Sequence, residues 1–204
     1  FTATCVVTVT KEVIDVKKSL SGTEYYILIM DGVTATKLGT KIKADLRPDQ
    51  LKKNLFIWDA TFNAGTTSGP NFYGEVEPWT SLIVANVGWS GGGFNIDDNT
   101  LTDKLAAITA NPTDYYLHIG IRSKGLAVYV FGLDGQSNAK FAIGANAFND
   151  NGTIIPAIAN FTRDGEWQEI EIPMSTLKTM GLLYSTSMGA KNILWFLAGG
   201  VSGT

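Results

Sequence analysis

The feature that most constrains this chain is a succession of short strand-like blocks separated by turn residues. Val, Ile, Thr, Tyr and Phe gather in the blocks, and Gly, Asn, Asp and Ser lie between them. Many short strands with turns between them predict an all-β sandwich or barrel. The predicted strands cover residues 4–10, 25–30, 54–62, 79–87, 115–123, 127–131, 140–144, 167–172 and 192–198.

Glycine-rich stretches predict the breaks between these strands. We expect a turn at residues 31–32, where Asp precedes Gly, and a Gly/Thr/Ser loop over 63–69. The three consecutive glycines within residues 88–94 predict a mobile or sharply bent loop, because glycine has the widest backbone freedom. These breaks divide the first half of the chain into separate strand blocks.

Helical patterns are few. Apolar residues at positions 101, 105 and 108, with Pro112 after them, predict one short helix over 99–108. Residues 175–182, which follow Pro173, suggest a further helical turn. The sequence therefore predicts an all-β fold that carries one short helix.

Composition excludes several classes of function. The 204 residues include 16 basic and 19 acidic side chains, for a net charge of −3. The basic residues form no stripe of the kind that marks a nucleic-acid-binding protein. No apolar run approaches the ~20 residues that span a bilayer, so we expect no transmembrane segment. Cys5 is the only cysteine and His118 the only histidine, so neither a disulfide nor a Cys/His zinc site is expected.

The block at residues 115–123 alternates clearly. Its odd-numbered apolar residues share one face, and the other face carries Tyr116, His118, Gly120 and Arg122. Gly120 leaves room for another group to approach this polar face. The polar face is therefore a candidate binding surface, although an ordinary solvated sheet face would show the same alternation.

Five segments resemble jelly-roll carbohydrate-binding modules. Residues 164–177, DGEWQEIEIPMSTL, are similar to a motif of those modules, and so are residues 114–123 and 192–200. Residues 55–59, together with 71–74, resemble the opening of modules in surface glycan-binding lipoproteins of gut-type Gram-negative bacteria. The resemblance implies a jelly-roll β-sandwich of two antiparallel sheets, on a protein that serves polysaccharide utilisation.

A further resemblance concerns the N-terminal residues. Residues 2–9, TATCVVTV, resemble the closing strand of a group-2 bacterial Ig-like domain. We therefore expect an Ig-like terminal strand in residues 1–11, a linker in 12–22 and the jelly-roll domain in 23–204. The family pattern continues into a closing strand that this sequence lacks, which predicts a gap in one sheet.

The resemblance implies carbohydrate binding at the cell surface, or by a secreted protein. The parent protein would carry a lipid anchor in the outer membrane and work beside outer-membrane transport partners. Sugars present apolar faces to aromatic rings and hydroxyl groups to planar polar side chains, so these residue types are the candidates for binding a polysaccharide or oligosaccharide. The candidate ligand-binding residues are Trp58, Tyr73, Trp79, Trp89, Tyr116, His118 and Arg122.

Other aromatic residues have competing core roles, and two other functions compete with carbohydrate binding. Trp167 and Trp195 lie in apolar strands and are expected in the core, and Trp79 and Trp89 could equally cover the end of the core. One alternative function is an adhesion or spacer module with no ligand. A second is a glycoside hydrolase or lyase, which needs a pair of carboxylates that no spacing in the sequence establishes.

The sequence predicts no catalytic residue and no metal ligand. Glu169 and Glu171 alternate outward on a strand, as exposed acidic residues commonly do. Calcium enters only through the resemblance, because jelly-roll modules frequently hold a structural calcium. The oxygen-rich stretches 97–99 and 149–152 do not match the EF-hand spacing, and a turn is the preferred interpretation of both. We therefore expect a non-catalytic protein without a cofactor.

Overall fold

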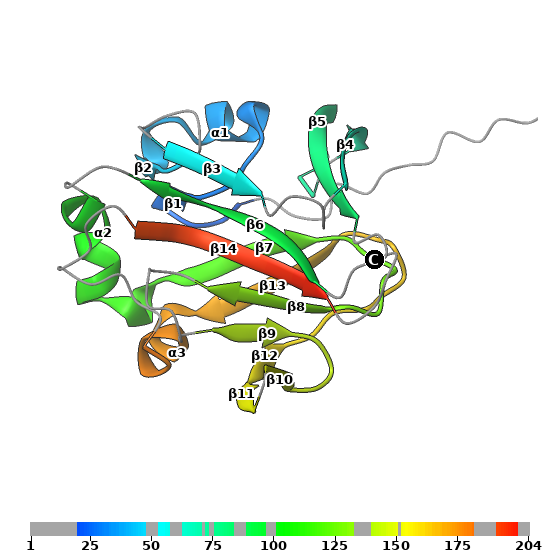
Figure 1. Cartoon of the computed structure of the whole chain (residues 1–204). Helices are drawn as coiled ribbons and strands as arrows, with labels where there is room; N and C mark the ends of the chain where they lie inside the picture. The colour runs from blue at the N-terminus through cyan, green and yellow to red at the C-terminus, as the bar shows by residue number, and fades with distance from the viewer. Residues whose placement is uncertain are drawn as a thin grey trace, which may run out of the picture.

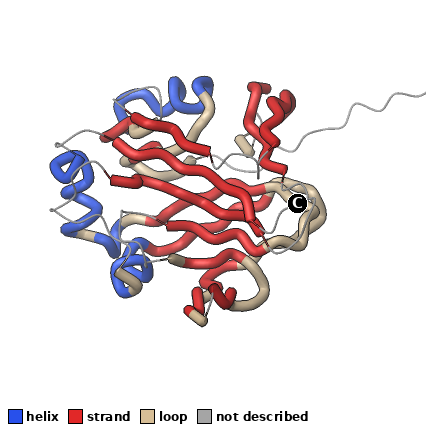
Figure 2. The backbone as a smooth tube through the Cα atoms, in the orientation of Figure 1, coloured by secondary structure: helices blue, strands red, loops and turns tan. Residues whose placement is uncertain are grey.

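A computed structural model describes residues 20–47, 53–57, 63–70, 72–73, 76–83, 89–96, 101–132, 140–150, 152–181 and 191–199. This part of the chain is mostly β, as the sequence predicts (Figure 2). Its helices are α1 (Gly32–Leu38), α2 (Leu101–Ala110) and α3 (Met174–Thr179), with 3-10 turns η1 (Gly39–Lys41) and η2 (Pro112–Asp114). Its strands are β1 (Tyr25–Ile27), β2 (Ile42–Asp45), β3 (Lys53–Ile57), β4 (Asn63–Pro70), β5 (Val76–Ile83), β6 (Trp89–Ile96), β7 (Tyr116–Ile121), β8 (Val128–Gly132), β9 (Phe141–Ile143), β10 (Phe148–Asp150), β11 (Thr153–Ile155), β12 (Ala157–Ala159), β13 (Gln168–Pro173) and β14 (Lys191–Gly199).

The largest sheet has six strands in the order β12-β9-β8-β14-β6-β3 (Figure 1). Its neighbours pair antiparallel except for β12 and β9, which run parallel. Strands β13 and β7 form a separate antiparallel pair, and β4 pairs with β5 and β10 with β11 in the same sense. Strands β1 and β2 pair parallel, with α1 in the connection between them.

The main core joins the six-stranded sheet to the β13–β7 pair. Phe141 and Ile143 of β9 are fully buried and pack in one cluster with Ile170 and Ile172 of β13. Helices α2 and α3 lie at one end of the strands and add Leu105 and Leu177 to this cluster (Figure 1). Burying a side chain of this size stabilises the fold by roughly 1.5–3 kcal/mol, so both layers depend on the shared core.

Two segments that were predicted as loops are strands. The predicted loop over 63–69 is β4, whose residues pair with β5 from Asn63↔Ile83 to Pro70↔Val76. The glycine run expected to bend the chain is the middle of β6, which pairs with β14 on one side and β3 on the other. Gly92 is buried there and faces Phe196 of β14 in the register. Backbone hydrogen bonds to the strands on both sides offset the conformational freedom of the glycines. The side chain of Phe196 compensates for the side chain that Gly92 lacks.

The predicted turn at residues 31–32 is the start of a helix. Asp31 has an extended backbone, and its Oδ1 accepts a hydrogen bond of 2.6 Å from the backbone N–H of Thr34. This is the arrangement of a helix N-cap. Asp favours N-cap positions as well as turns, which explains why the sequence predicted a turn here. The fold therefore has α1 besides the predicted helix, which is α2, and the suggested helical turn after Pro173, which is α3.

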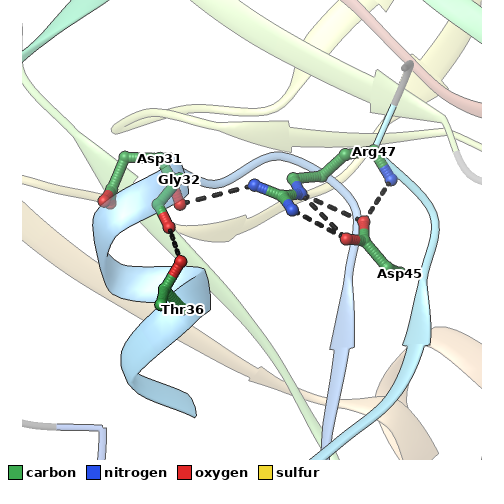
Figure 3. Close-up of polar contacts among 5 residues, drawn as sticks. All are labelled: Asp31, Gly32, Thr36, Asp45 and Arg47. Atoms are coloured by element: carbon green, nitrogen blue, oxygen red, sulfur yellow. Dashed lines mark hydrogen bonds and ion pairs between the residues drawn. The ribbon is translucent and has the colours of Figure 1, made fainter. Parts of the chain in front are cut away.

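An arginine ties the start of α1 to the end of β2 (Figure 3). The guanidinium of Arg47 donates hydrogen bonds to both carboxylate oxygens of Asp45, with Nη2 2.7 Å from Oδ2 and Nε 3.0 Å from Oδ1. Its Nη1 also donates to the carbonyl oxygen of Asp31 at 3.5 Å, and within the helix Thr36 Oγ1 donates to the carbonyl oxygen of Gly32. These contacts hold the first turn of α1 in a fixed place beside the candidate site.

The domain boundaries stay predictions. Residues 1–19 lie outside the described residues, and with them the predicted strand over 4–10 and the Ig-like segment. The predicted gap left by a missing closing strand is likewise not decided by the described strands.

Candidate functional site

The candidate site is the outer face of β7 and β13, defined here as Tyr116, His118, Gly120, Glu169 and Glu171. Alternation along each strand separates this face from the core. Leu117 and Ile119 of β7 pack against the main core, as do Ile170 and Ile172 of β13. Since the core takes one face of both strands, the polar residues between these apolar ones lie together on the opposite face.

His118 and Glu169 form a close pair on this face. His118 Nε2 lies 2.5 Å from Glu169 Oε1, and 22% and 12% of the two side chains are exposed. The register of the two strands explains the contact, because His118 faces Glu171 directly and Glu169 is the diagonal neighbour opposite Gly120. Side chains across an antiparallel pair come within reach both directly and diagonally. The pairing of β7 with β13 thus places two carboxylates beside one imidazole.

Tyr73 contacts the other nitrogen of the imidazole. Its hydroxyl oxygen lies 3.5 Å from His118 Nδ1, and the two rings stack with centroids 6.2 Å apart and 27° between their planes. Burial raises the pKa of Tyr73 to about 12, and the negative charge of Asp31 at the start of α1 adds to the rise. Tyr73 is therefore neutral near pH 7, so its hydroxyl is a stable hydrogen-bonding group for the imidazole.

Phe72 fills the room that Gly120 leaves. A Cβ atom at Gly120 would lie 2.8 Å from Phe72 Cγ, which is closer than real Cβ contacts allow. Phe72 is 8% exposed, and its ring meets His118 edge-on at a centroid distance of 5.2 Å. The sequence predicted that a group approaches Gly120, and in the structure that group is a side chain of the protein itself.

Trp167 joins this aromatic group. The sequence indicated a core position, but its half-buried ring lies edge-on to Phe72, with centroids 6.4 Å apart and planes at 82°. Trp167 precedes β13 and has the same parity as Glu169 and Glu171, which explains why it points to their face. Tyr116 lies on this face two residues before His118 and is 61% exposed. Aromatic side chains thus surround the His118–Glu169 pair.

Arg122, a predicted ligand-binding residue, contacts the backbone of the loop before β13. It lies just beyond the end of β7, and its Nε donates a 2.6 Å hydrogen bond to the carbonyl oxygen of Gly165. Gly165 has a φ of +87°, and a Cβ there would also collide with Lys124. Arg122 therefore holds the loop that leads into β13 through a hydrogen bond to the protein's own backbone.

The structure brings together three of the predicted ligand-binding residues, which are Tyr73, Tyr116 and His118. Trp58 lies outside the described residues, and so do the side chains of Trp79 in β5 and Trp89 in β6. Sequence reasoning missed Phe72, Glu169 and Glu171 as members of the site. Pairing residues 116–121 antiparallel with 168–173 would have found the two glutamates, because both blocks alternate and have matching lengths.

The stretches considered for calcium are only partly described. Residues 97–99 lie outside the described residues. In the second stretch, Asn149 Oδ1 accepts the backbone N–H of Gly152 at 2.7 Å, and Asp150 Oδ2 accepts from Lys140 Nζ at 2.8 Å. Asp150 faces Thr153 in the β10–β11 hairpin, and the Asn149 oxygen serves its turn, in agreement with the turn interpretation, whereas the Asp150 carboxylate pairs with Lys140.

Within the described residues, no helix is long and apolar enough to cross a membrane. Comparison of the sequence with protein-family models and with curated proteins found no significant match.

Proposed function

We propose that the outer face of β7 and β13 binds carbohydrate without transforming it. The observation that carries this proposal is the gathering of Phe72, Tyr73, Trp167 and Tyr116 on the face that bears the His118–Glu169 pair. Sugar recognition needs flat apolar rings beside hydrogen-bonding groups with fixed positions. This face offers both, and Tyr116, His118 and Glu169 lie on two paired strands, which hold side chains more firmly than loops do.

The residues of this face divide into supporting and contacting groups by their exposure. Phe72 is nearly buried and Glu169 is mostly buried, so they position the imidazole and the indole ring. Tyr116 and Glu171 are exposed, and Trp167 is half-buried, so these three present surfaces to a ligand. A sugar ring stacked on Tyr116 would place its hydroxyl groups near the oxygens of Glu171, because Glu171 is the diagonal neighbour of Tyr116 across the two strands.

The proposal includes the finer fold and the setting expected from the sequence resemblance. The shared core of the six-stranded sheet and the β13–β7 pair supports a two-layer jelly-roll sandwich. The setting is the cell surface, in a lipid-anchored or secreted parent protein that delivers a polysaccharide or oligosaccharide to outer-membrane transport partners. These parts of the proposal rest on the sequence motifs of residues 114–123, 164–177 and 192–200.

The direct experiment is calorimetric titration of the chain with a panel of soluble polysaccharides and oligosaccharides. We expect one glycan class to bind, and Tyr116→Ala and Trp167→Ala each to weaken binding by about 2- to 10-fold, because a stacked ring contributes roughly 0.5–1.5 kcal/mol. The matched control is Ile154→Ala, which removes an equally exposed apolar side chain from the β10–β11 hairpin.

Two results would oppose the proposal. Absence of binding to every glycan of the panel would favour the adhesion or spacer interpretation, in which the aromatic side chains only stabilise the fold. Equal affinity of Tyr116→Ala, Trp167→Ala and Ile154→Ala for a bound glycan would move the binding site to another surface.

One observation favours a second candidate function, which is glycoside hydrolysis. A carboxylate oxygen of Glu169 and one of Glu171 lie within 4.8 Å of each other. Retaining glycosidases hold their two carboxyl groups about 5–5.5 Å apart. Release of reducing sugar from a bound glycan by the wild-type chain, lost in Glu171→Gln, would establish hydrolysis, and binding without release would leave the site a recognition site.

A further inference from the structure

Three side chains of the outer face bring potential metal-ligand atoms together. One donor atom each from His118, Glu169 and Glu171 lies within 4.8 Å of the other two. Two ligand atoms bonded to one metal ion at ~2.0–2.2 Å lie at most ~4.4 Å apart, so this spacing is slightly wider than a bound ion would require. The spacing therefore allows the three atoms to converge on a single ion after small side-chain movements.

The chemistry of these atoms selects a class of ion. Calcium takes six to eight oxygen ligands, and magnesium takes oxygen ligands in a near-ideal octahedron, so a site with an imidazole and two carboxylates suits neither. Imidazole suits zinc and its first-row neighbours, and carboxylate oxygens complete many zinc sites. Two carboxylates also balance the charge of a divalent cation, since the imidazole binds a metal in its neutral form.

The framework around the three atoms is that of a prepared site. His118 and Glu171 are directly opposite each other on β7 and β13, and Glu169 is two residues before Glu171 on the same strand. Because two hydrogen-bonded strands hold all three Cα atoms, little backbone order must be gained when an ion binds. Glu169 and His118 are mostly buried, whereas Glu171 is exposed, so solvent can reach the ion from one side.

Tyr73 supplies the partner that a metal-bound histidine needs. Histidine ligands almost always donate their second ring N–H to an acceptor, which fixes the tautomer and the ring orientation. Here Nε2 faces the carboxylates, and Nδ1 lies 3.5 Å from the hydroxyl oxygen of Tyr73. Phe72 packs edge-on against the same imidazole and limits its rotation.

We propose that His118, Glu169 and Glu171 bind a divalent transition-metal ion, with zinc as the ion that fits their donor set. Binding replaces the hydrogen bond between Nε2 and Glu169 with two metal–ligand bonds, and a proton held between them leaves to solvent. The fourth position, on the exposed side of Glu171, is open to water or to an oxygen of a ligand. This inference does not require that the outer face binds sugar.

The test is calorimetric titration of the chain with ZnCl2 in a Cys5→Ser background, which removes the single thiol of the sequence. We expect one ion to bind per chain, and Glu171→Gln to weaken zinc binding by more than about tenfold. Even the loss of a residue that only hydrogen-bonds to a metal ligand lowers metal affinity by about 10- to 100-fold. Glu171 is exposed and its substitution leaves the His118–Glu169 pair in place, so this variant is expected to fold.

The matched control is Glu166→Gln, which removes a carboxylate from an exposed position just before β13 and outside the three-residue group. It should bind zinc as the parent chain does. Failure of the parent chain to bind zinc, or equal weakening by Glu166→Gln and Glu171→Gln, would overturn the inference. A chain that binds zinc but no glycan would uphold the metal site and reject the proposed function. A chain that binds a glycan but no zinc would uphold the proposed function and reject the metal site.

Discussion

His118 Nε2 and Glu169 Oε1 lie 2.5 Å apart, although 51 positions separate the two residues in the sequence. The contact exists because β7 and β13 pair antiparallel in one register, with Glu169 opposite Gly120. A shift of that register by one residue would turn Glu169 toward the core and break the pair. The hydrogen bond is therefore a sensitive report of correct pairing between these strands.

Replacement of Glu169 by Gln should destabilise the protein. Gln keeps the size of the side chain but removes the charge beside the mostly buried imidazole, and a hydrogen bond to a charged group contributes about 1.5–3 kcal/mol. We expect the free energy of unfolding in urea to fall by about 1–2 kcal/mol. This is near the low end of the range for such a hydrogen bond, because neither side chain is fully buried. Glu171→Gln is the control and should change it by less than about 0.5 kcal/mol, because Glu171 is exposed. Equal losses in both variants would show that the pair adds no stability of its own.

Gly120→Ala should disturb the site through Phe72. The added Cβ would lie 2.8 Å from Phe72 Cγ, so the phenyl ring must move away from His118. Overpacking of this kind costs about 1–3 kcal/mol. A double variant with Phe72→Ala should recover part of the loss, and a double-mutant cycle of urea unfolding measures that coupling.

Gly144→Ala is the matched control for this substitution. Gly144 is buried, whereas Gly120 is exposed, but a Cβ at Gly144 would meet only Arg163 Nη2 at 3.8 Å, which is an ordinary contact. We expect it to cost less than Gly120→Ala. If the two losses are equal and Phe72→Ala restores nothing, then the close approach of Phe72 to Gly120 does not determine the effect.

The alternating blocks of the sequence were sufficient to predict much of the β structure but little of its pairing. Residues 115–123 and 167–172 were correctly placed on strands, and the polar side chains of the first block do face away from the core. Their partnership was not predictable from either block alone, because strand pairing depends on the fold and not on local pattern. For that reason Glu169 and Glu171 were interpreted as ordinary exposed acids.

Glycine and aspartate caused the errors in the fold prediction. Both residue types favour turns, so the glycines of β6 were interpreted as a loop and Asp31 as part of a turn. In the structure, pairing on two sides keeps the glycines extended, and the Asp31 side chain caps α1. Trp167 was misplaced for a related reason, since an aromatic residue in an apolar motif fits a core and a surface cluster equally well.

Arg163→Lys should destabilise the loop region around β8. The guanidinium carbon of Arg163 lies 4.1 Å from the ring centroid of Phe161 and 4.9 Å from that of Tyr129. Its Nη1 donates to the carbonyl oxygens of Gly125 and Ala127 at 2.7 and 3.0 Å. Lys lacks the planar group that makes both kinds of contact, so we expect a loss of about 1–2 kcal/mol in urea unfolding.

Arg122→Lys is the control for the loss of planarity in an arginine. Arg122 is exposed, and among the described residues its guanidinium donates one hydrogen bond, to the carbonyl oxygen of Gly165. We expect a smaller loss than for Arg163→Lys. A loss in Arg122→Lys that equals or exceeds the loss in Arg163→Lys would contradict the stabilising role given to the aromatic contacts.

The raised pKa of Tyr73 predicts a loss of stability at alkaline pH. Tyrosine titrates at about 10 in an unfolded chain, and burial raises the pKa of Tyr73 to about 12 in the folded protein. Between these values the unfolded state releases the proton first, so stability is complete below about pH 10 and falls as pH rises toward 12. Tyr25 and Tyr115 also have raised pKa values, so the contribution of Tyr73 must be isolated by comparison with Tyr73→Phe. We expect the wild type to lose about 1–2 kcal/mol more than Tyr73→Phe over this range, less than the full shift implies because Tyr73 is partly exposed.

Asp31→Asn tests the electrostatic part of the same effect without removing the helix cap. The amide oxygen of Asn can still accept the hydrogen bond from Thr34, so α1 should keep its first turn. The variant lacks the negative charge that adds to the raised pKa of Tyr73, and burial, the larger cause, is unchanged. We therefore expect the pKa of Tyr73 to fall but to stay above its ordinary value.

In the alkaline unfolding series, Asp31→Asn should lose less stability than the wild type and more than Tyr73→Phe. A curve that coincides with the wild type would show that the charge of Asp31 does not reach the Tyr73 hydroxyl, and a curve that coincides with Tyr73→Phe would show that burial contributes nothing.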